Sequence, residues 1–143
     1  DWNEGNGVSI TDWIGFIGSL EHAIGYQKVF WPEFILYQDG IFLKEGFSEQ
    51  AFQEWQNSDT KPNLQQIQQV MNHRHIWDLF YHKNEDLDDA TLINQVNYLG
   101  LAMKEMWSIK AKNDFPSLKT NVEFHLAENA DNIDAVNVSI WAD

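Results

Sequence analysis

Residues 34–43 read FILYQDGIFL, and in this stretch two short apolar runs flank the dipeptide Asp39-Gly40. Asp-Gly between two such runs is a strong short-range signal for a β-hairpin, because both residues adopt the backbone angles of a tight turn easily. Both runs are apolar at successive positions, so we expect the hairpin to be covered on both sides or to lie centrally in its sheet. Residues 33–44 therefore predict the first pair of strands.

A second hairpin is predicted in the last quarter of the chain. Apolar and polar residues alternate over 117–126, and the alternation returns over 136–141. A period of two is typical of a strand with one buried face and one exposed face. We expect residues 117–141 to form an amphipathic hairpin that shares one antiparallel sheet with the first.

An N-terminal helix is predicted by apolar residues that recur every three or four positions. Ser9 or Thr11 can begin this helix, and Gly25 can end it. We expect its apolar stripe to be buried against another element. The stripe comprises Trp13, Ile14, Phe16, Ile17, Leu20, Ala23 and Ile24.

Three further helices are predicted between the two hairpins. Ser48 can begin a short one, and residues 64–82 have the periodicity of a second. The second helix has two apolar sets that are rotated from each other, so it either bends near Asn72 or is central and apolar most of the way round. The third helix begins at Asp88 or Asp89 and ends shortly before Pro116.

These elements predict one α+β domain over residues 1–143, with residues 1–8 as a loose N-terminal segment. The expected order is an N-terminal helix, a β-hairpin, three further helices and a C-terminal β-hairpin, with the helices packed on an antiparallel sheet. A chain of 143 residues has the usual length of one domain. No internal repeat or linker divides it.

The charge is strongly acidic, with 22 Asp and Glu against 9 Lys and Arg and a net charge of −13. Such a field repels nucleic acid and anionic membranes and attracts basic proteins. The chain has no Cys, which excludes disulfide scaffolds, thiol nucleophiles and Cys-ligated metal sites. The missing Cys and the lack of a visible signal peptide lead us to expect a cytoplasmic protein.

The most concentrated polar chemistry lies between His73 and His82. On a continuous helix His75, Asp78 and His82 would share one face, but the two histidines would lie about 10 Å apart along the axis, too far to bind one ion directly. Arg74 could clamp an anion or a carboxylate, or pair with Asp78 one turn away. We therefore predict binding residues here, but no metal site.

Glu33 is a second candidate binding residue because its neighbours are apolar. Burial would raise the pKa of its carboxyl group, which could then act as an acid or a base. The side chain could equally reach outward or meet Lys28. Because no nucleophile motif or phosphate-binding loop is present, we predict no catalytic residue and no cofactor.

In its size, acidity, missing Cys and order of elements, the chain resembles small acidic bacterial immunity and antitoxin proteins. This resemblance is one of kind, and no motif carries it. The net charge of −13, the lack of catalytic motifs and the many aromatic residues lead us to expect a non-enzymatic protein that binds a basic protein partner, with toxin neutralisation as the sharpest form of the hypothesis. Two alternatives are a small enzyme or metal-dependent protein that uses His73 to His82, and a structural subunit of an assembly. The oligomeric state stays open.

Overall fold

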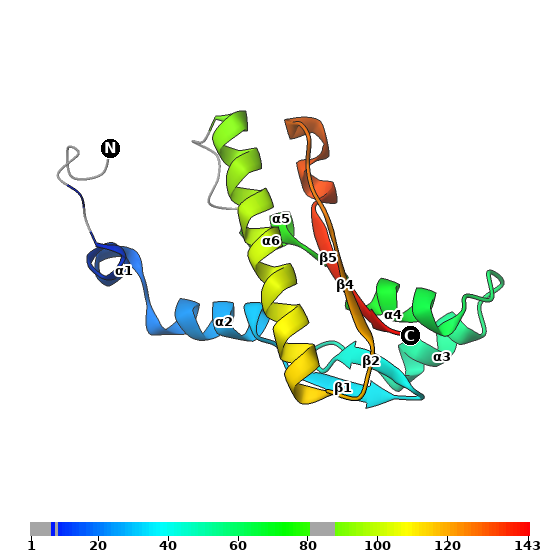
Figure 1. Ribbon diagram of the computed structural model, residues 1–143. Coiled ribbons are helices and arrows are strands. Elements are labelled where there is room, and N and C mark those ends of the chain that lie inside the picture. Colours follow the sequence, from blue (N-terminus) through cyan, green and yellow to red (C-terminus); the bar gives the residue numbers. More distant parts are fainter. Residues whose placement is uncertain (1–6, 8, 81–87) are drawn as a thin grey trace.

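We analysed a computed structural model of the chain, which describes Gly7 and residues 9–80 and 88–143 (Figure 1). The predicted loose segment 1–8 lies outside the described residues, apart from Gly7. The fold is α+β, with helices packed on antiparallel sheets, as the sequence pattern predicts. In chain order the elements are α1 (Ile10–Ile17), α2 (Leu20–Phe30), β1 (Phe34–Tyr37), β2 (Gly40–Leu43), α3 (Glu49–Gln56), α4 (Leu64–Asn72), β3 (Arg74–His75), α5 (Ile76–Phe80), α6 (Asp89–Asp114), β4 (Thr120–His125), the 3₁₀ segment η3 (Ala130–Ala135) and β5 (Asn137–Ala142).

Strands β1 and β2 form the predicted hairpin, with Tyr37 opposite Gly40 at its closed end. Its two turn residues are Gln38 and Asp39, one position earlier than the predicted Asp39-Gly40, because Gly40 already pairs with Tyr37 in β2. Their φ angles of 47° and 67° are those of a tight hairpin turn. Every residue of β2 is buried, whereas Leu36 of β1 is 51% exposed. The expectation of cover on both sides therefore holds for β2 but fails for β1, beside whose outer edge no further strand lies among the described residues.

The predicted C-terminal hairpin is also present, as β4 and β5 of a three-stranded sheet in the order β3-β5-β4. The long helix α6, which Asp88 caps, packs alongside β4 and β5 (Figure 1). The main core fills the space between them and includes Met103, Trp107 and Ile140, all buried. Among the described residues no helix is long and apolar enough to cross a membrane.

A smaller, aromatic core lies under the first hairpin. Phe42 and Phe52 meet there with ring centroids 5.6 Å apart, and Ile67 from α4 packs against them. Ser48 caps α3 by accepting a hydrogen bond from the backbone of Ala51, as its position predicts. Helices α3 and α4 thus hold the hairpin against the rest of the fold.

The two hairpins form two sheets, which corrects the expectation of a single sheet. Two buried amide side chains of α4, Gln68 and Asn72, lie between β2 and the C-terminal half of β5, beyond the residues of β5 that pair with β3. The Oε1 atom of Gln68 accepts hydrogen bonds from the backbone N–H groups of Ile41 (2.8 Å) and Ala142 (2.9 Å). Its Nε2 atom donates to the carbonyl of Ala142 at 3.1 Å.

Asn72 repeats this arrangement one helical turn later. Its Oδ1 atom accepts from the N–H of Leu43 at 2.9 Å, and its Nδ2 atom donates to the carbonyls of Ile41 and Ile140, each at 2.8 Å. Buried backbone groups need such partners, because an unpaired one costs free energy. Side-chain amides therefore replace a direct strand ladder between the two sheets.

The predicted helix over residues 64–82 is interrupted, close to the predicted bend. Helix α4 ends at Asn72, and Arg74 and His75 form β3, which pairs with Val138 and Asn137 of β5. A separate short helix, α5, then begins. The physical reason is the open edge of β5, whose backbone groups bind those of residues 74 and 75.

The N-terminal helix also differs from its prediction, in continuity, length and burial. Ser9 begins α1, but the backbone is extended at Gly18, and α2 starts after Ser19 and continues beyond Gly25 to Phe30. A Cβ atom at Gly18 would lie 2.5 Å from the carbonyl oxygen of Ile14, so this sharp end of α1 requires glycine. The predicted stripe is not buried, because residues 9–28 are all exposed.

Gly100 lies where α6 closely approaches β4. A Cβ atom there would lie 2.3 Å from a ring carbon of Phe124. We expect Gly100→Ala to lower the free energy of unfolding by about 1–3 kcal/mol through overpacking, although alanine is the better helix former. Thermal unfolding followed by circular dichroism measures this effect.

Gly25→Ala is the matched control for that variant, since Gly25 lies in α2 with nothing within 4 Å of an added Cβ atom. We expect Gly25→Ala to leave the melting temperature unchanged or slightly raised. A Gly100→Ala protein as stable as the wild type would contradict the close packing of α6 on β4.

Candidate functional site

A cavity of about 560 Å³ lies where α2 joins the body of the fold. The end of α2, the loop after β2, β3, α5 and α6 all contribute to its wall. Its apolar wall includes Trp31, Pro32, Leu43, Leu79 and Trp107. Its size lies in the range of small-molecule sites, which is about 300–1,000 Å³.

Arg74, the only arginine of the chain, lines this cavity from β3. Its guanidinium group is half-buried and donates to two backbone carbonyls, those of His73 at 2.9 Å and Glu45 at 3.1 Å. Burial lowers the pKa of Arg74, and the nearby charge of Glu45 partly opposes that shift. The predicted ion pair with Asp78 is not formed, because the two residues do not share a helix.

Glu33 lines the same cavity, but its environment differs from the predicted one. Its side chain is 72% exposed and pairs with Lys44, with 2.5 Å between Oε2 and Nζ. The hydrogen bond and the positive charge of Lys44 lower the pKa of Glu33. Of the alternatives considered for Glu33, the side chain that reaches outward is the one found, and the pKa is lowered instead of raised because this carboxyl group faces solvent and Lys44.

Three other predicted binding residues, His73, His75 and Asp78, are not part of the cavity wall. The rings of His73 and His75 meet edge to face at 5.1 Å, and the Nδ1 atoms of these rings lie within hydrogen-bond distance of the Val70 and Asp134 carbonyls, respectively. Asp78 is exposed on α5. His82 lies outside the described residues. The proposed shared face of His75, Asp78 and His82 is lost, because His75 belongs to a strand.

Sequence reasoning therefore found two wall residues, Arg74 and Glu33, but not that they line one cavity. It did not identify Lys44, although the hairpin register offers a signal. Phe34 lies opposite Leu43, so Glu33 and Lys44 follow as the next pair, and the backbone of Lys44 donates to Glu33 at 2.9 Å. No local signal places Trp107 in the wall, since it lies far from the other residues in sequence.

A second candidate surface is the N-terminal arm, which we define as residues 9–26. The arm projects from the body of the fold beside α6 (Figure 1). Its large apolar side chains are exposed, from 45% for Trp13 to 84% for Leu20. Within α1, Ile10, Trp13, Ile14 and Ile17 have the spacing of a single helix face.

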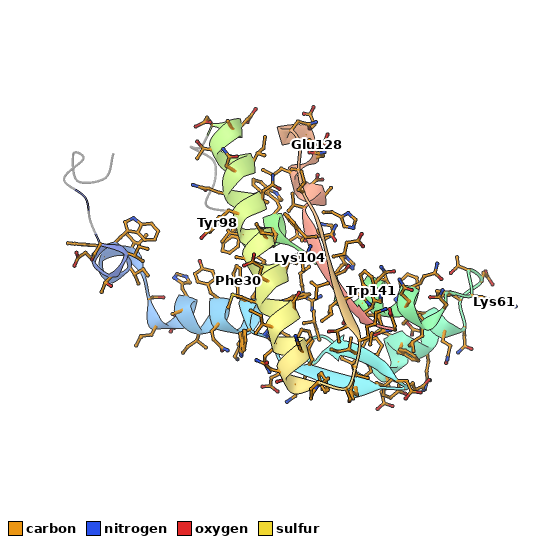
Figure 2. The ribbon with its side chains drawn as sticks, viewed as in Figure 1. Phe30, Lys61, Tyr98, Lys104, Glu128 and Trp141 are labelled. Carbon is orange, nitrogen blue, oxygen red and sulfur yellow. The ribbon has the colours of Figure 1, made fainter. Side chains whose placement is uncertain are left out.

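The arm is held at its base by the last turn of α2. The indole Nε1 of Trp107 donates to the carbonyl of Val29 at 2.9 Å, and Phe30 packs against the main core beside α6 (Figure 2). The rings of Tyr26 and Phe80 lie 5.5 Å apart. The cavity thus lies at the point where the arm is anchored.

Within the described residues, no group of three or more His, Asp or Glu side chains is arranged to hold a metal ion. The described residues thus present two candidate binding features, the exposed apolar arm and the cavity at its base. Comparisons with protein-family models, with curated proteins and with solved structures found no match to this chain.

Proposed function

We propose that this protein is a non-enzymatic binding protein whose N-terminal arm inserts into an apolar groove on a basic protein partner. The observation that carries this proposal is the exposure of the arm's apolar face, with Ile10 at 77% and Ile17 at 58%. Recognition of a helix in a groove uses anchors at positions i, i+3, i+4 and i+7, which is the spacing found in α1. A basic toxin is the sharpest form of such a partner.

The low intrinsic stability of α1 supports a binding role. The helix has eight residues, none of them buried. Isolated helices shorter than about 12–15 residues are marginal in water, and most helices in proteins gain their stability by packing an apolar face. A groove that covers Trp13, Ile14 and Ile17 would supply that packing.

The charge of the arm favours a basic partner over a membrane or a second copy of this chain. The arm carries Asp12 and Glu21 and has no Lys or Arg. Membrane-surface helices are usually rich in Lys and Arg on their polar face, which this arm lacks. Two copies of this chain would repel each other, because each carries a net charge of −13. A groove bordered by Lys and Arg instead complements the arm and speeds encounter.

The test is affinity capture from the source organism at low and physiological salt, followed by titration of the purified partner. We expect the wild type to retain a basic protein with an affinity that falls as salt increases. Trp13→Ala is expected to weaken binding about thirtyfold or more, as for a central aromatic anchor. Calorimetry with the recovered protein measures both effects.

Leu126→Ala is the matched control, since it truncates an exposed apolar side chain outside the arm. It should bind the partner as the wild type does. Capture of an acidic protein, or of a partner that the Trp13→Ala variant binds equally well, would refute the proposal. A wild-type dimer that Trp13→Ala dissociates, seen by light scattering, would assign the arm to a second copy instead.

A further inference from the structure

We propose that the cavity at the base of the arm binds a small organic carboxylate with an apolar body, and that Arg74 engages the carboxylate. This site is independent of the protein partner proposed above. It rests on the unused donors of Arg74, on the charge of the cavity wall and on the indole surfaces beside it.

Arg74 has hydrogen-bond donors to spare. A guanidinium group carries five N–H donors, and two of them bind the carbonyls of His73 and Glu45. Among the described residues Arg74 forms no ion pair with a carboxylate; the ion pairs found there involve lysines and a histidine. A half-buried cation without a paired anion favours an anionic ligand, and the planar guanidinium matches a carboxylate with two parallel hydrogen bonds.

The cavity wall is positive in a strongly acidic protein. Three of the nine basic residues line it, Lys28, Lys44 and Arg74, but only two of the 22 acidic residues, Glu33 and Glu45. Lys44 already pairs with Glu33. The remaining wall charges are two positive groups, Lys28 and Arg74, and one carboxylate, Glu45. The wall therefore keeps one net positive charge for a ligand.

The remaining wall is suited to an apolar, ring-shaped body. Trp31 and Trp107 both line the cavity, with Leu43 and Leu79 beside them. Trp107 is 1% exposed and its Nε1 is bound by the Val29 carbonyl, so the half-buried Trp31 offers the more accessible ring surface. A ligand with a phenyl group next to a carboxylate would satisfy both parts of the wall.

The experiment titrates the full-length wild-type chain with phenylacetate, with its neutral analogue phenylacetamide and with inorganic phosphate, up to about 10 mM because ligands this small bind weakly. Two-dimensional NMR of the tryptophan indole N–H groups is the readout. We expect phenylacetate to shift the signals of Trp31 and Trp107 but leave that of Trp55 unchanged. Phenylacetamide and phosphate should each bind about tenfold more weakly or not at all, because phenylacetamide lacks the carboxylate and phosphate lacks the phenyl ring.

Variants test the role of Arg74 itself. Arg74→Gln is expected to weaken phenylacetate binding about tenfold or more. Arg74→Lys should weaken it less, because lysine keeps the positive charge but cannot form two parallel hydrogen bonds to a carboxylate. Lys61→Gln makes the same change of charge outside the cavity wall and should bind as the wild type does (Figure 2). Circular dichroism establishes that each variant is folded. If Arg74→Gln does not fold, Lys28→Gln at the exposed rim replaces it and is expected to weaken binding severalfold.

Several results would overturn the proposal. These are equal affinities for phenylacetate and phenylacetamide, equal affinities for phenylacetate and phosphate, shifts confined to other tryptophans, and no binding at the highest concentration. A folded Arg74→Gln variant that binds phenylacetate like the wild type would do the same. Each of these results leaves the arm proposal intact, because the arm is tested by a separate partner assay.

Discussion

Replacing Asn72 by Leu is expected to lower the free energy of unfolding by about 4 kcal/mol, because three buried backbone groups lose their partners. These groups are the N–H of Leu43 and the carbonyls of Ile41 and Ile140. Each unsatisfied buried group costs about 1–3 kcal/mol, and leucine of similar size cannot replace the bonds. Urea unfolding followed by circular dichroism measures the change.

Asn94→Leu is the control for this prediction, since Asn94 is exposed on α6. We expect it to change the free energy of unfolding by no more than about 0.5 kcal/mol. Gln68→Leu should resemble Asn72→Leu, and the two effects should not add, because both amides bind the backbone of Ile41. A loss below about 1 kcal/mol for Asn72→Leu would mean that the sheets are held together by apolar contacts alone.

The bridge between the sheets illustrates what the sequence could predict and what it could not. Both hairpins follow from local patterns, a turn dipeptide in one and strict alternation in the other. Nothing local to Gln68 or Asn72 indicates that their amides bind strands, since the partners lie 27 to 74 residues away. An amide on a helix is usually exposed, so the pattern alone predicts a polar surface where the structure has a buried junction.

The same limit explains the interrupted helix and the candidate site. The periodicity of residues 64–82 favours a helix, but pairing of Arg74 and His75 with β5 outweighs that local preference. Arg74 was identified from its chemistry alone, because it is the only arginine of the chain and is flanked by two histidines. Its place in a cavity depends on contacts with the loop after β2, which is 29 residues away at Glu45.

The exposed arm shows a different limit, since its helical character was predicted, although not the break at Gly18, while its burial was predicted wrongly. Apolar spacing indicates that a face will be covered, but not whether the same chain or another one covers it. Trp13 and Ile14 have the pattern of core residues and are nevertheless exposed. This disagreement between pattern and burial is what directs attention to a partner.

Replacing Trp107 by Ala is expected to lower the free energy of unfolding by about 4 kcal/mol, the loss typical of a fully buried aromatic residue. Its ring is 1% exposed and meets that of Phe34 edge to face at 6.0 Å. The substitution would also remove one wall of the cavity. Chemical unfolding measures the loss, and Trp55→Ala on the exposed face of α3 serves as the control, with a much smaller expected effect.

Trp107→Phe separates packing from anchoring. Phenylalanine keeps a ring in the core but cannot donate to the carbonyl of Val29, which lies in the last turn of α2, where carbonyls lack partners within the helix. We expect a smaller loss of about 1–2 kcal/mol. Relative to the wild type, amide hydrogen exchange should become faster in residues 20–30, and by more than in α6. If exchange in residues 20–30 stayed at the wild-type rate, the arm would be held by the packing of Phe30 and Tyr26 instead. The indole hydrogen bond would then contribute to the core without fixing the arm.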